Sequence, residues 1–506
     1  MTFSQLLDGA EVLSRSGDAD VRGIEYDSRQ VHPGDVFVAI KGEKTDGNHH
    51  IDAAIKAGAA AVITDSPAEA PRPGVAWVVT PHGRRALARV SANFYRRPAE
   101  KLAMSGITGT NGKTTAAFLL ESILTAAGRN TLMAGTIECH VAGRVLPAPH
   151  TTPEALELER MFSEGVRAGA TEAVMEVSSH ALAQERVFGL PFQVAVFTNL
   201  TRDHLDYHGS FEEYFAAKRV LFSGCGAGPP PFAVVNLDDE YGRELAQFSK
   251  GKSEVLGYGL EKGDFHAEKI VLGQSGTRFD LAGPEAKWPI WSPLAGRFNV
   301  YNILAAAAAA YARNCSGPQI VQGVAALSRV PGRFEKIDMG QPFTLVVDYA
   351  HTDDALRNLT ALAREFVSRN KGRVITLFGC GGNRDRSKRP LMGEAAGKGS
   401  DFVVLTSDNP RNEDPLAIMN DALPGLQRTG VRYSLEPDRG KAIVLALNEA
   451  RPGDIVLLAG KGHEQQQIGR EGAVPFNDAA VAREVLAQLG YGLNPAVAEP
   501  GKEADL

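Results

Sequence analysis

A glycine-rich segment, Gly109-Thr110-Asn111-Gly112-Lys113-Thr114-Thr115, contains the residue types that bind nucleotide phosphates. Backbone N–H groups of a glycine loop can approach phosphate oxygens, a lysine neutralises their charge and a threonine hydroxyl can bind Mg²⁺. The segment follows the apolar stretch LAMSGI and precedes the helical pattern AAFLLESIL. This strand, loop and helix order predicts that all seven residues bind ATP, and a glycine turn without a ligand is the alternative.

Two further polar groups follow apolar stretches that are typical of buried strands. Glu176 comes at the end of EAVME, and His204 follows VAVFTNL in the motif TRDHLDYH. Because the carboxyl ends of parallel strands meet at one edge of a sheet, both can converge on the phosphates. A solvated or capping glutamate is the alternative for Glu176. His204 and His208 form an HxxxH pair, but no third ligand nearby supports zinc.

Many other motifs resemble those of one enzyme family. HTTPE, EVSSHALAQERV, TNLTRDHLDYHG, VPGRFE, DYAH, GCGGNRDRSKRP, SDNPRNED and GKGHE follow in the order found in the Mur ligases. The phosphate loop is also similar to that of the folylpolyglutamate synthetases, but DSR at 27–29 and PGDVFVAIKG resemble the uridine-nucleotide-binding domain that folate enzymes lack. The resemblance covers nearly the whole chain.

The resemblance implies a role for individual residues in ATP and Mg²⁺ binding. It makes Lys113, Glu176, His204 and Lys218 catalytic, with Lys218 carbamylated to N6-carboxylysine. The implied Mg²⁺ ligands are Thr114, Glu176, His204 and the Lys218 carbamate. Asn299, Arg333 and Asp348 are expected to contact the adenosine and phosphates of ATP.

The resemblance also implies two substrate sites. Hydroxyl, amide and guanidinium groups suit a UDP-linked sugar peptide; the implied contacts are Tyr26, Ser28, Glu43, Lys44, Thr45, Thr151, Thr152, Ser178, Gln184 and Arg186. The implied contacts to the incoming amino acid are Arg384, Asp408, Asn409, Pro410, Arg411, Gly460 and Glu464. Arg411 can hold a carboxylate bidentately, which favours diaminopimelate over lysine as the donor.

These residues need an α/β scaffold to position them. Short apolar strands alternate with helical patterns throughout, which predicts mostly parallel sheets with crossover helices. We expect three domains: an N-terminal uridine-nucleotide-binding α/β domain at 1–100, a central phosphate-loop domain at 101–332 and a C-terminal Rossmann-like domain at 333–492. We expect the tail, 493–506, to be disordered.

Composition excludes several classes of protein. The net charge of −6 provides no basic excess for nucleic acid. The four cysteines form no CxxC pair, and the longest apolar run, 303–312, is too short to cross a bilayer. We therefore expect a cytoplasmic monomer that acts on small molecules.

Together these patterns predict an ATP-dependent amide ligase. The resemblance implies that ATP phosphorylates the D-glutamate carboxylate of a UDP-muramoyl dipeptide, and that the amine of meso-diaminopimelate attacks the resulting acyl phosphate. Three alternatives remain: the same reaction with L-lysine, a catalytically silent nucleotide-binding protein, and a folate-type ligase.

Overall fold

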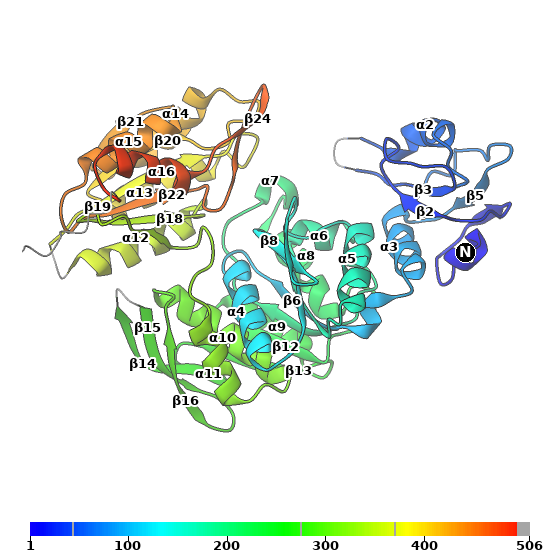
Figure 1. Ribbon diagram of the computed structural model, residues 1–506, viewed down its shortest axis with the longest axis horizontal. Helices are drawn as coiled ribbons and strands as arrows, with labels where there is room; N and C mark the ends of the chain where they lie inside the picture. The colour runs from blue at the N-terminus through cyan, green and yellow to red at the C-terminus, as the bar shows by residue number, and fades with distance from the viewer. Residues whose placement is uncertain (43–44, 274–275, 369–370, 493–506) are drawn as a thin grey trace, which may run out of the picture. The chain divides into compact units, whose positions relative to one another are not determined.

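The computed structural model describes residues 1–42, 45–273, 276–368 and 371–492. Compact packing divides the chain into two units. The first contains Met1–Thr201 and His208–Ser328, and the second contains Arg202–Tyr207 with the described residues from Arg329 onward. The chain has the predicted three-domain α/β architecture, with one major sheet in each domain (Figure 1). The predicted tail lies outside the described residues.

The N-terminal sheet has five strands in the order β1-β5-β4-β3-β2. Four strands are parallel, and β1 pairs antiparallel with β5. The internal strand β3 is buried along its whole length, which explains its continuous apolar sequence. The strands are β1 Ser14–Ser16, β2 Gly23–Glu25, β3 Asp35–Ala39, β4 Ala61–Thr64 and β5 Ala76–Val79, with helices α1 Phe3–Leu6, α2 Ile51–Lys56 and α3 Gly83–Phe94.

The central sheet has eleven strands in the order β16-β15-β14-β13-β12-β11-β6-β10-β7-β8-β9. Its middle is parallel, as predicted, whereas β14–β16 and β7–β9 add antiparallel pairs at both ends. The strands are β6 Ala103–Thr108, β7 Thr131–Ala134, β8 Glu138–Val141, β9 Arg144–Pro147, β10 Glu172–Glu176, β11 Phe192–Phe197, β12 Phe232–Asn236, β13 Glu254–Gly259, β14 Phe265–Gly273, β15 Gly276–Ala282 and β16 Lys287–Ser292.

Helices cover this sheet on both faces (Figure 1). The helix that follows the phosphate loop, α4, packs against α10 and α11. Helix α10 is buried almost all round because its run of alanines has no polar face. The helices are α4 Lys113–Ala126, α5 Ala155–Arg167, α6 Ser179–Ala183, α7 Leu205–His208, α8 Phe211–Ser223, α9 Glu240–Ser249, α10 Arg297–Ala312 and α11 Gly317–Ala326.

The C-terminal sheet has the order β17-β18-β22-β19-β20-β21. The four strands predicted from apolar runs, β18, β19, β20 and β22, are parallel and lie at its centre. A separate hairpin, β23–β24, follows β22. The strands are β17 Glu335–Ile337, β18 Thr344–Asp348, β19 Val374–Cys380, β20 Phe402–Ser407, β21 Arg432–Leu435, β22 Ile455–Ala459, β23 Gln466–Gly469 and β24 Gly472–Pro475; the helices are α12 Asp353–Ser368, α13 Lys388–Gly399, α14 Pro415–Gln427, α15 Arg439–Glu449 and α16 Asp478–Gln488.

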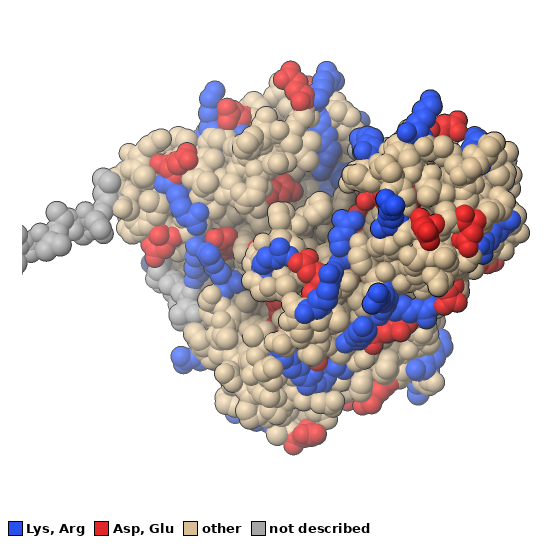
Figure 2. All heavy atoms as spheres, turned by 45° about the vertical axis from the view of Figure 1, so that its right-hand side comes forward, with Lys and Arg blue, Asp and Glu red and all other residues tan. Residues whose placement is uncertain are grey.

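The surface carries charges of both signs. On the face drawn in Figure 2, basic and acidic side chains are interspersed, in keeping with the small net charge of the sequence. Within the described ranges, no helix is long and apolar enough to span a bilayer.

A half-buried histidine joins the phosphate-loop helix to the strand pair at the sheet edge. His140 on β8 lies 2.7 Å from Glu121 on α4 and 3.0 Å from Glu138. Burial alone would lower the pKa of His140, but the hydrogen bonds and charges of Glu121 and Glu138 outweigh it and raise the pKa to about 9. The protonated imidazole therefore stabilises the fold.

We predict a pH-dependent loss of stability for His140→Gln. Because the folded pKa lies above the usual 6.5, the stabilisation is complete below about pH 6.5 and disappears as pH rises through about 9. Urea unfolding should show a deficit of roughly 2–3 kcal/mol at pH 6 and almost none at pH 10. His82→Gln, at an exposed position, is the control. A deficit that does not change with pH would contradict this assignment.

Candidate active site

The phosphate loop lies between β6 and α4, at the middle of the central sheet. Gly109 and Gly112 have φ angles of +145° and +90°. Residues other than glycine rarely adopt such angles. A Cβ at Gly109 would collide with Thr198 Oγ1, and one at Gly112 with Asn302 Oδ1. Both glycines are therefore required by the close packing of the loop.

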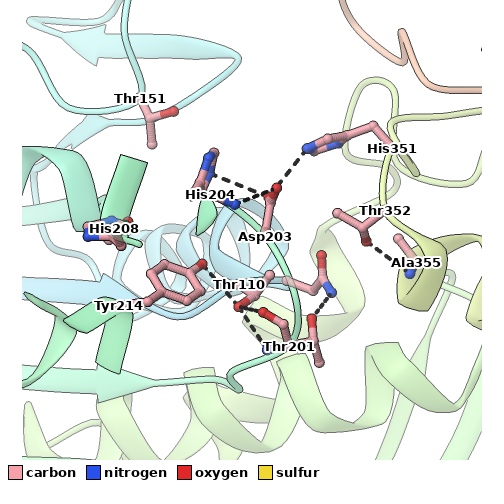
Figure 3. A network of polar contacts seen from close by, with 12 residues as sticks. Thr110, Thr151, Thr201, Asp203, His204, His208, Tyr214, His351, Thr352 and Ala355 are labelled. Atoms are coloured by element: carbon pink, nitrogen blue, oxygen red, sulfur yellow. Dashed lines mark hydrogen bonds and ion pairs between the residues drawn. The ribbon is translucent and has the colours of Figure 1, made fainter. Parts of the chain in front are cut away.

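Neighbouring side chains fix the loop conformation. Asn199 Oδ1 accepts a 2.9 Å hydrogen bond from the Asn111 backbone, and Thr198 Oγ1 donates one of 2.6 Å to the Asn111 carbonyl. Tyr214 OH lies 3.1 Å from Thr110 Oγ1, which also accepts from the backbone of Thr201 (Figure 3). No role was expected for Asn199, Thr198 or Asn302, although the motif TNL at a strand end was a usable signal for the first two.

Two lysines reach the loop carbonyls. Lys113 Nζ donates to the carbonyls of Gly109 and Thr110, both at 2.9 Å, and Lys218 Nζ donates to Gly109 at 2.8 Å. Lys218 is only 1% exposed and its ammonium lies over the Tyr214 ring, 4.4 Å from the centroid. Positive charge is therefore concentrated where phosphates would bind.

Oxygen ligands converge at the carboxyl end of β10. Glu176 is fully buried, and its Oε2 accepts hydrogen bonds of 2.9 Å from the hydroxyls of both Thr114 and Thr136. The Thr136 backbone donates to Oε1 at 2.7 Å. Hydroxyl and carboxylate oxygens are the hard donors that Mg²⁺ prefers, so this pair fits the ion that the resemblance implies.

His204 belongs to the segment that packs with the C-terminal unit. Asp203 Oδ2 lies 3.4 Å from His204 Nε2 and 3.6 Å from His351 Nε2 (Figure 3), and Asp203 Oδ1 lies 3.4 Å from Lys388 Nζ. Burial opposes the charge of Asp203, but its interactions with His204, Lys388 and His351 outweigh it and hold its pKa well below the usual range. The charged carboxylate thereby anchors the His204 segment.

The other histidine of the HxxxH pair lies in the first unit. His208 Nε2 is 2.9 Å from Ser179 Oγ. Burial, together with the nearby His180 and Lys218, lowers the pKa of His208 to about 4. In the described part of the chain, no cluster of three or more His, Cys, Asp or Glu side chains could hold a metal ion.

Four of the residues expected to bind the UDP-linked acceptor form one cluster. Thr152 Oγ1 accepts from the backbone of Ser178 at 3.0 Å, and its carbonyl accepts from Arg186 at 2.9 Å. Arg186 also contacts Gln184 Oε1 at 2.7 Å and Glu154 at 3.0 Å. The structure thus places a buried hydroxyl, an amide and a guanidinium side by side.

The remaining acceptor residues are distributed more widely. Thr151 Oγ1 accepts from Thr136 at 3.2 Å, which connects it to the Glu176 cluster. In the N-terminal domain, Tyr26 OH donates to Glu157 of α5 at 3.1 Å. Ser28 is half-buried after β2, and Thr45 is exposed. Glu43 and Lys44 lie outside the described residues.

The residues expected around adenosine fall in both units. Asn299 at the start of α10 accepts from Asn302 at 3.0 Å and donates to the Ala295 carbonyl at 2.8 Å. In the C-terminal unit, Asp348 accepts from the backbone of Phe334 at 2.7 Å, and Arg333 lies over the Tyr349 ring. Burial raises the pKa of Asp348 despite the nearby Arg333.

The residues expected to bind the donor amino acid gather in the C-terminal unit. Arg411 donates to the Gly382 carbonyl at 2.8 Å, and burial together with the nearby Arg384 lowers its pKa. Asn409 Nδ2 donates to Glu464 Oε2 at 2.8 Å. Pro410 and Arg411 line a cleft of about 650 Å³. Gly460 has a φ of +113° and brings the chain close to Asp408.

A fully buried ion pair supports the loops that follow β20 and β22. Arg439 binds Asp478 through two hydrogen bonds of 2.8 and 2.6 Å, and both side chains are inaccessible to solvent. The same guanidinium donates to the carbonyls of Ser407 and Ala459, the last residues of β20 and β22. It therefore connects the two strand ends that carry the donor site.

The chain belongs to the Mur ligase family. Family models match the catalytic domain at residues 20–95, the middle domain at 107–310 and the glutamate ligase domain at 332–462. The chain is 56% identical to the UDP-N-acetylmuramoyl-L-alanyl-D-glutamate–2,6-diaminopimelate ligase of Solibacter usitatus, over 93% of this chain and 94% of the relative. It is 44% identical to the ligase of the same name from Geobacillus thermodenitrificans, over 94% and 97%.

Solved structures agree with this assignment. One of a UDP-N-acetylmuramoyl-L-alanyl-D-glutamate–2,6-diaminopimelate ligase matches with a TM-score of 0.64 and 34% identity, covering 93% of this chain and 96% of the other. The MurF ligase of Acinetobacter baumannii shares the fold, with a TM-score of 0.66, 21% identity and coverage of 96% and 98%.

We predict that Arg439→Met destabilises the C-terminal domain by about 3–5 kcal/mol, because Asp478 becomes an unpaired buried charge. The double variant Arg439→Met/Asp478→Leu should recover most of this loss. Urea unfolding followed by circular dichroism measures both. Arg483→Met, an exposed position on α16, is the control. Equal losses in the single and double variants would contradict the assigned role of the pair.

Proposed function

We propose that this protein is an ATP-dependent ligase that joins meso-2,6-diaminopimelate to UDP-N-acetylmuramoyl-L-alanyl-D-glutamate in peptidoglycan precursor synthesis. The observation that carries the proposal is the site around the phosphate loop. There Lys113 and Lys218 donate hydrogen bonds to the Gly109 carbonyl, and Thr114, the residue after Lys113, donates one to Glu176. The relative that is 56% identical to this chain, and that aligns with it over nearly its full length, is named for this reaction. Because ATP and the nucleotide-linked substrate are cytoplasmic, we place the reaction there, catalysed by a monomer.

The proposed reaction has two steps. A carboxylate oxygen of the acceptor's D-glutamate attacks the γ-phosphorus of ATP, the bond to the β-phosphate oxygen breaks, and ADP leaves. The donor amine then attacks the acyl carbon, the C–O bond to phosphate breaks, and the amine loses a proton. Neither step needs a protein nucleophile, so positioning and charge neutralisation supply the catalysis.

Individual residues have distinct tasks in this scheme. Lys113 and the loop N–H groups bind the β- and γ-phosphates. Thr114 and Glu176 are suited to hold Mg²⁺, with His204 as a further ligand. Carbamylation of Lys218 would replace its ammonium by an anionic carbamate, which would be another ligand; the bound ion would neutralise phosphate charge. The Thr152, Ser178, Gln184 and Arg186 cluster is suited to the acceptor, with Tyr26 and Ser28 toward its nucleotide.

Diaminopimelate is favoured over L-lysine because of Arg411. The two donors differ by one carboxylate, which a planar guanidinium can bind through two parallel hydrogen bonds. Arg411 lines the cleft in the C-terminal domain, and Glu464 lies nearby to pair with an ammonium. A folate-type ligase is disfavoured by the N-terminal domain matched at 20–95.

Ligation assays test the proposed reaction directly. The purified protein with ATP, Mg²⁺ and UDP-muramoyl dipeptide should release phosphate with meso-diaminopimelate and much less with L-lysine. Lys113→Ala should lower kcat at least 100-fold because phosphate charge is left uncompensated, whereas Lys101→Ala should not. Turnover by Lys113→Ala at a near-normal rate would refute the scheme, and absence of turnover with either donor would favour a silent nucleotide-binding protein.

We predict that Arg411→Lys raises KM for diaminopimelate roughly 10- to 100-fold, because an ammonium cannot reproduce the bidentate contact. KM for ATP should stay the same. Steady-state kinetics with each substrate varied in turn measures this effect, and Arg428→Lys, at an exposed position in the same domain, is the control. An unchanged KM would show that another group binds the distal carboxylate.

A further inference from the structure

One lysine among the residues expected to bind the donor has no role in the proposed reaction. Lys461 follows β22 and is completely buried. Its Nζ donates to Asn409 Oδ1 at 3.0 Å and to Glu464 Oε2 at 2.8 Å, and lies 3.6 Å from Asp408 Oδ1. Three of the residues expected to contact the donor amino acid, Asp408, Asn409 and Glu464, therefore surround the Lys461 ammonium.

The geometry gives this ammonium a specific effect on Glu464. Asn409 Nδ2 and Lys461 Nζ both donate to Oε2 of that carboxylate, each at 2.8 Å. Within the described residues, no hydrogen bond reaches its Oε1, and the Glu464 side chain is 27% exposed. One oxygen is thus held by the protein, and the other is left for an external cation.

The same contact sets the orientation of Asn409. Its Oδ1 accepts from Lys461 and from the backbone of Ile468, at 3.0 and 2.9 Å, so its Nδ2 must face Glu464. Lys461 has only donors, which makes this amide orientation the one that satisfies every atom. Removal of the ammonium would release both Glu464 and Asn409.

Charge balance gives a reason for burying a lysine here. A buried ammonium is costly unless it is paired and hydrogen-bonded. Lys461 has two carboxylates within 3.6 Å, Asp408 and Glu464. It offsets one of their charges, and the Arg411 guanidinium lies close enough to interact with both carboxylates.

We propose that Lys461 is a positioning residue for the donor amino acid, acting through Glu464 and Asn409. It holds the Glu464 carboxylate oriented so that Oε1 binds a donor ammonium. The inference rests on the proposed function and deepens it. A purely structural role, in which Lys461 only joins the ends of β20 and β22, is the competing explanation.

Kinetics of Lys461→Met distinguishes the two roles. A positioning role predicts a roughly 10- to 100-fold increase in KM for diaminopimelate, with KM for ATP and for the UDP-linked acceptor within about two-fold of wild type. Lys398→Met, an exposed lysine of α13 that pairs with Glu394, is the control. Equal increases in all three KM values together with a lower melting temperature would overturn the proposal.

A double-mutant cycle tests the route through Glu464. If Lys461 acts through that carboxylate, Lys461→Met should add less than three-fold to KM for diaminopimelate in a Glu464→Gln background. Multiplicative effects would contradict the route. Should Lys461→Met fail to fold, Lys461→Gln carries the same test. Wild-type turnover is measured in parallel: its absence would refute the proposed function, whereas normal turnover with an unchanged KM in the variant would refute only the role of Lys461.

Discussion

Burial of charge at the carboxyl ends of parallel strands is the constraint on which both catalytic regions depend. In the central domain, buried Lys218 donates to the Gly109 carbonyl and ties helix α8 to the phosphate loop. In the C-terminal domain, buried Arg439 binds the carbonyls that end β20 and β22. In both places a cation satisfies carbonyl groups that would otherwise lose their hydrogen bonds on burial. The loops are therefore held in place before any substrate arrives.

This arrangement separates stability from recognition. The Arg439–Asp478 pair has no exposed surface and anchors the donor loops, while Arg411 and Glu464 stay partly exposed above them. Similarly, Asn199 and Thr198 fix the phosphate loop by binding the backbone N–H and carbonyl of Asn111. Because the supporting side chains are committed to the protein, the substrate-facing groups are preorganised at little further entropic cost.

Much of the scaffold could be predicted from the sequence, because continuous apolar runs such as VFVAI and TLVVD are buried parallel strands. The antiparallel strands β14–β16 were not predicted. A bulge between Glu268 and Val271 interrupts the alternation of polar and apolar residues in β14, although β15 alternates regularly. For the site, the phosphate-loop pattern and the strand ends selected Lys113 and Glu176, and the resemblance selected Arg411. The supporting residues Thr136, Asn199 and Arg439 were missed, because they lie far from the residues they contact in the sequence and only the fold brings them close.

Lys461 shows most clearly what spacing alone leaves out. In GKGHE it is one more polar residue of a glycine-rich loop, which would ordinarily suggest a solvated side chain. Burial changes that interpretation, since a fully desolvated ammonium must have partners. Asp408 and Asn409 come from the loop after β20, and Glu464 comes from the same loop as Lys461. The proposed donor site is therefore best understood as a network of opposite charges in which Lys461 holds Glu464 and Asn409 in place.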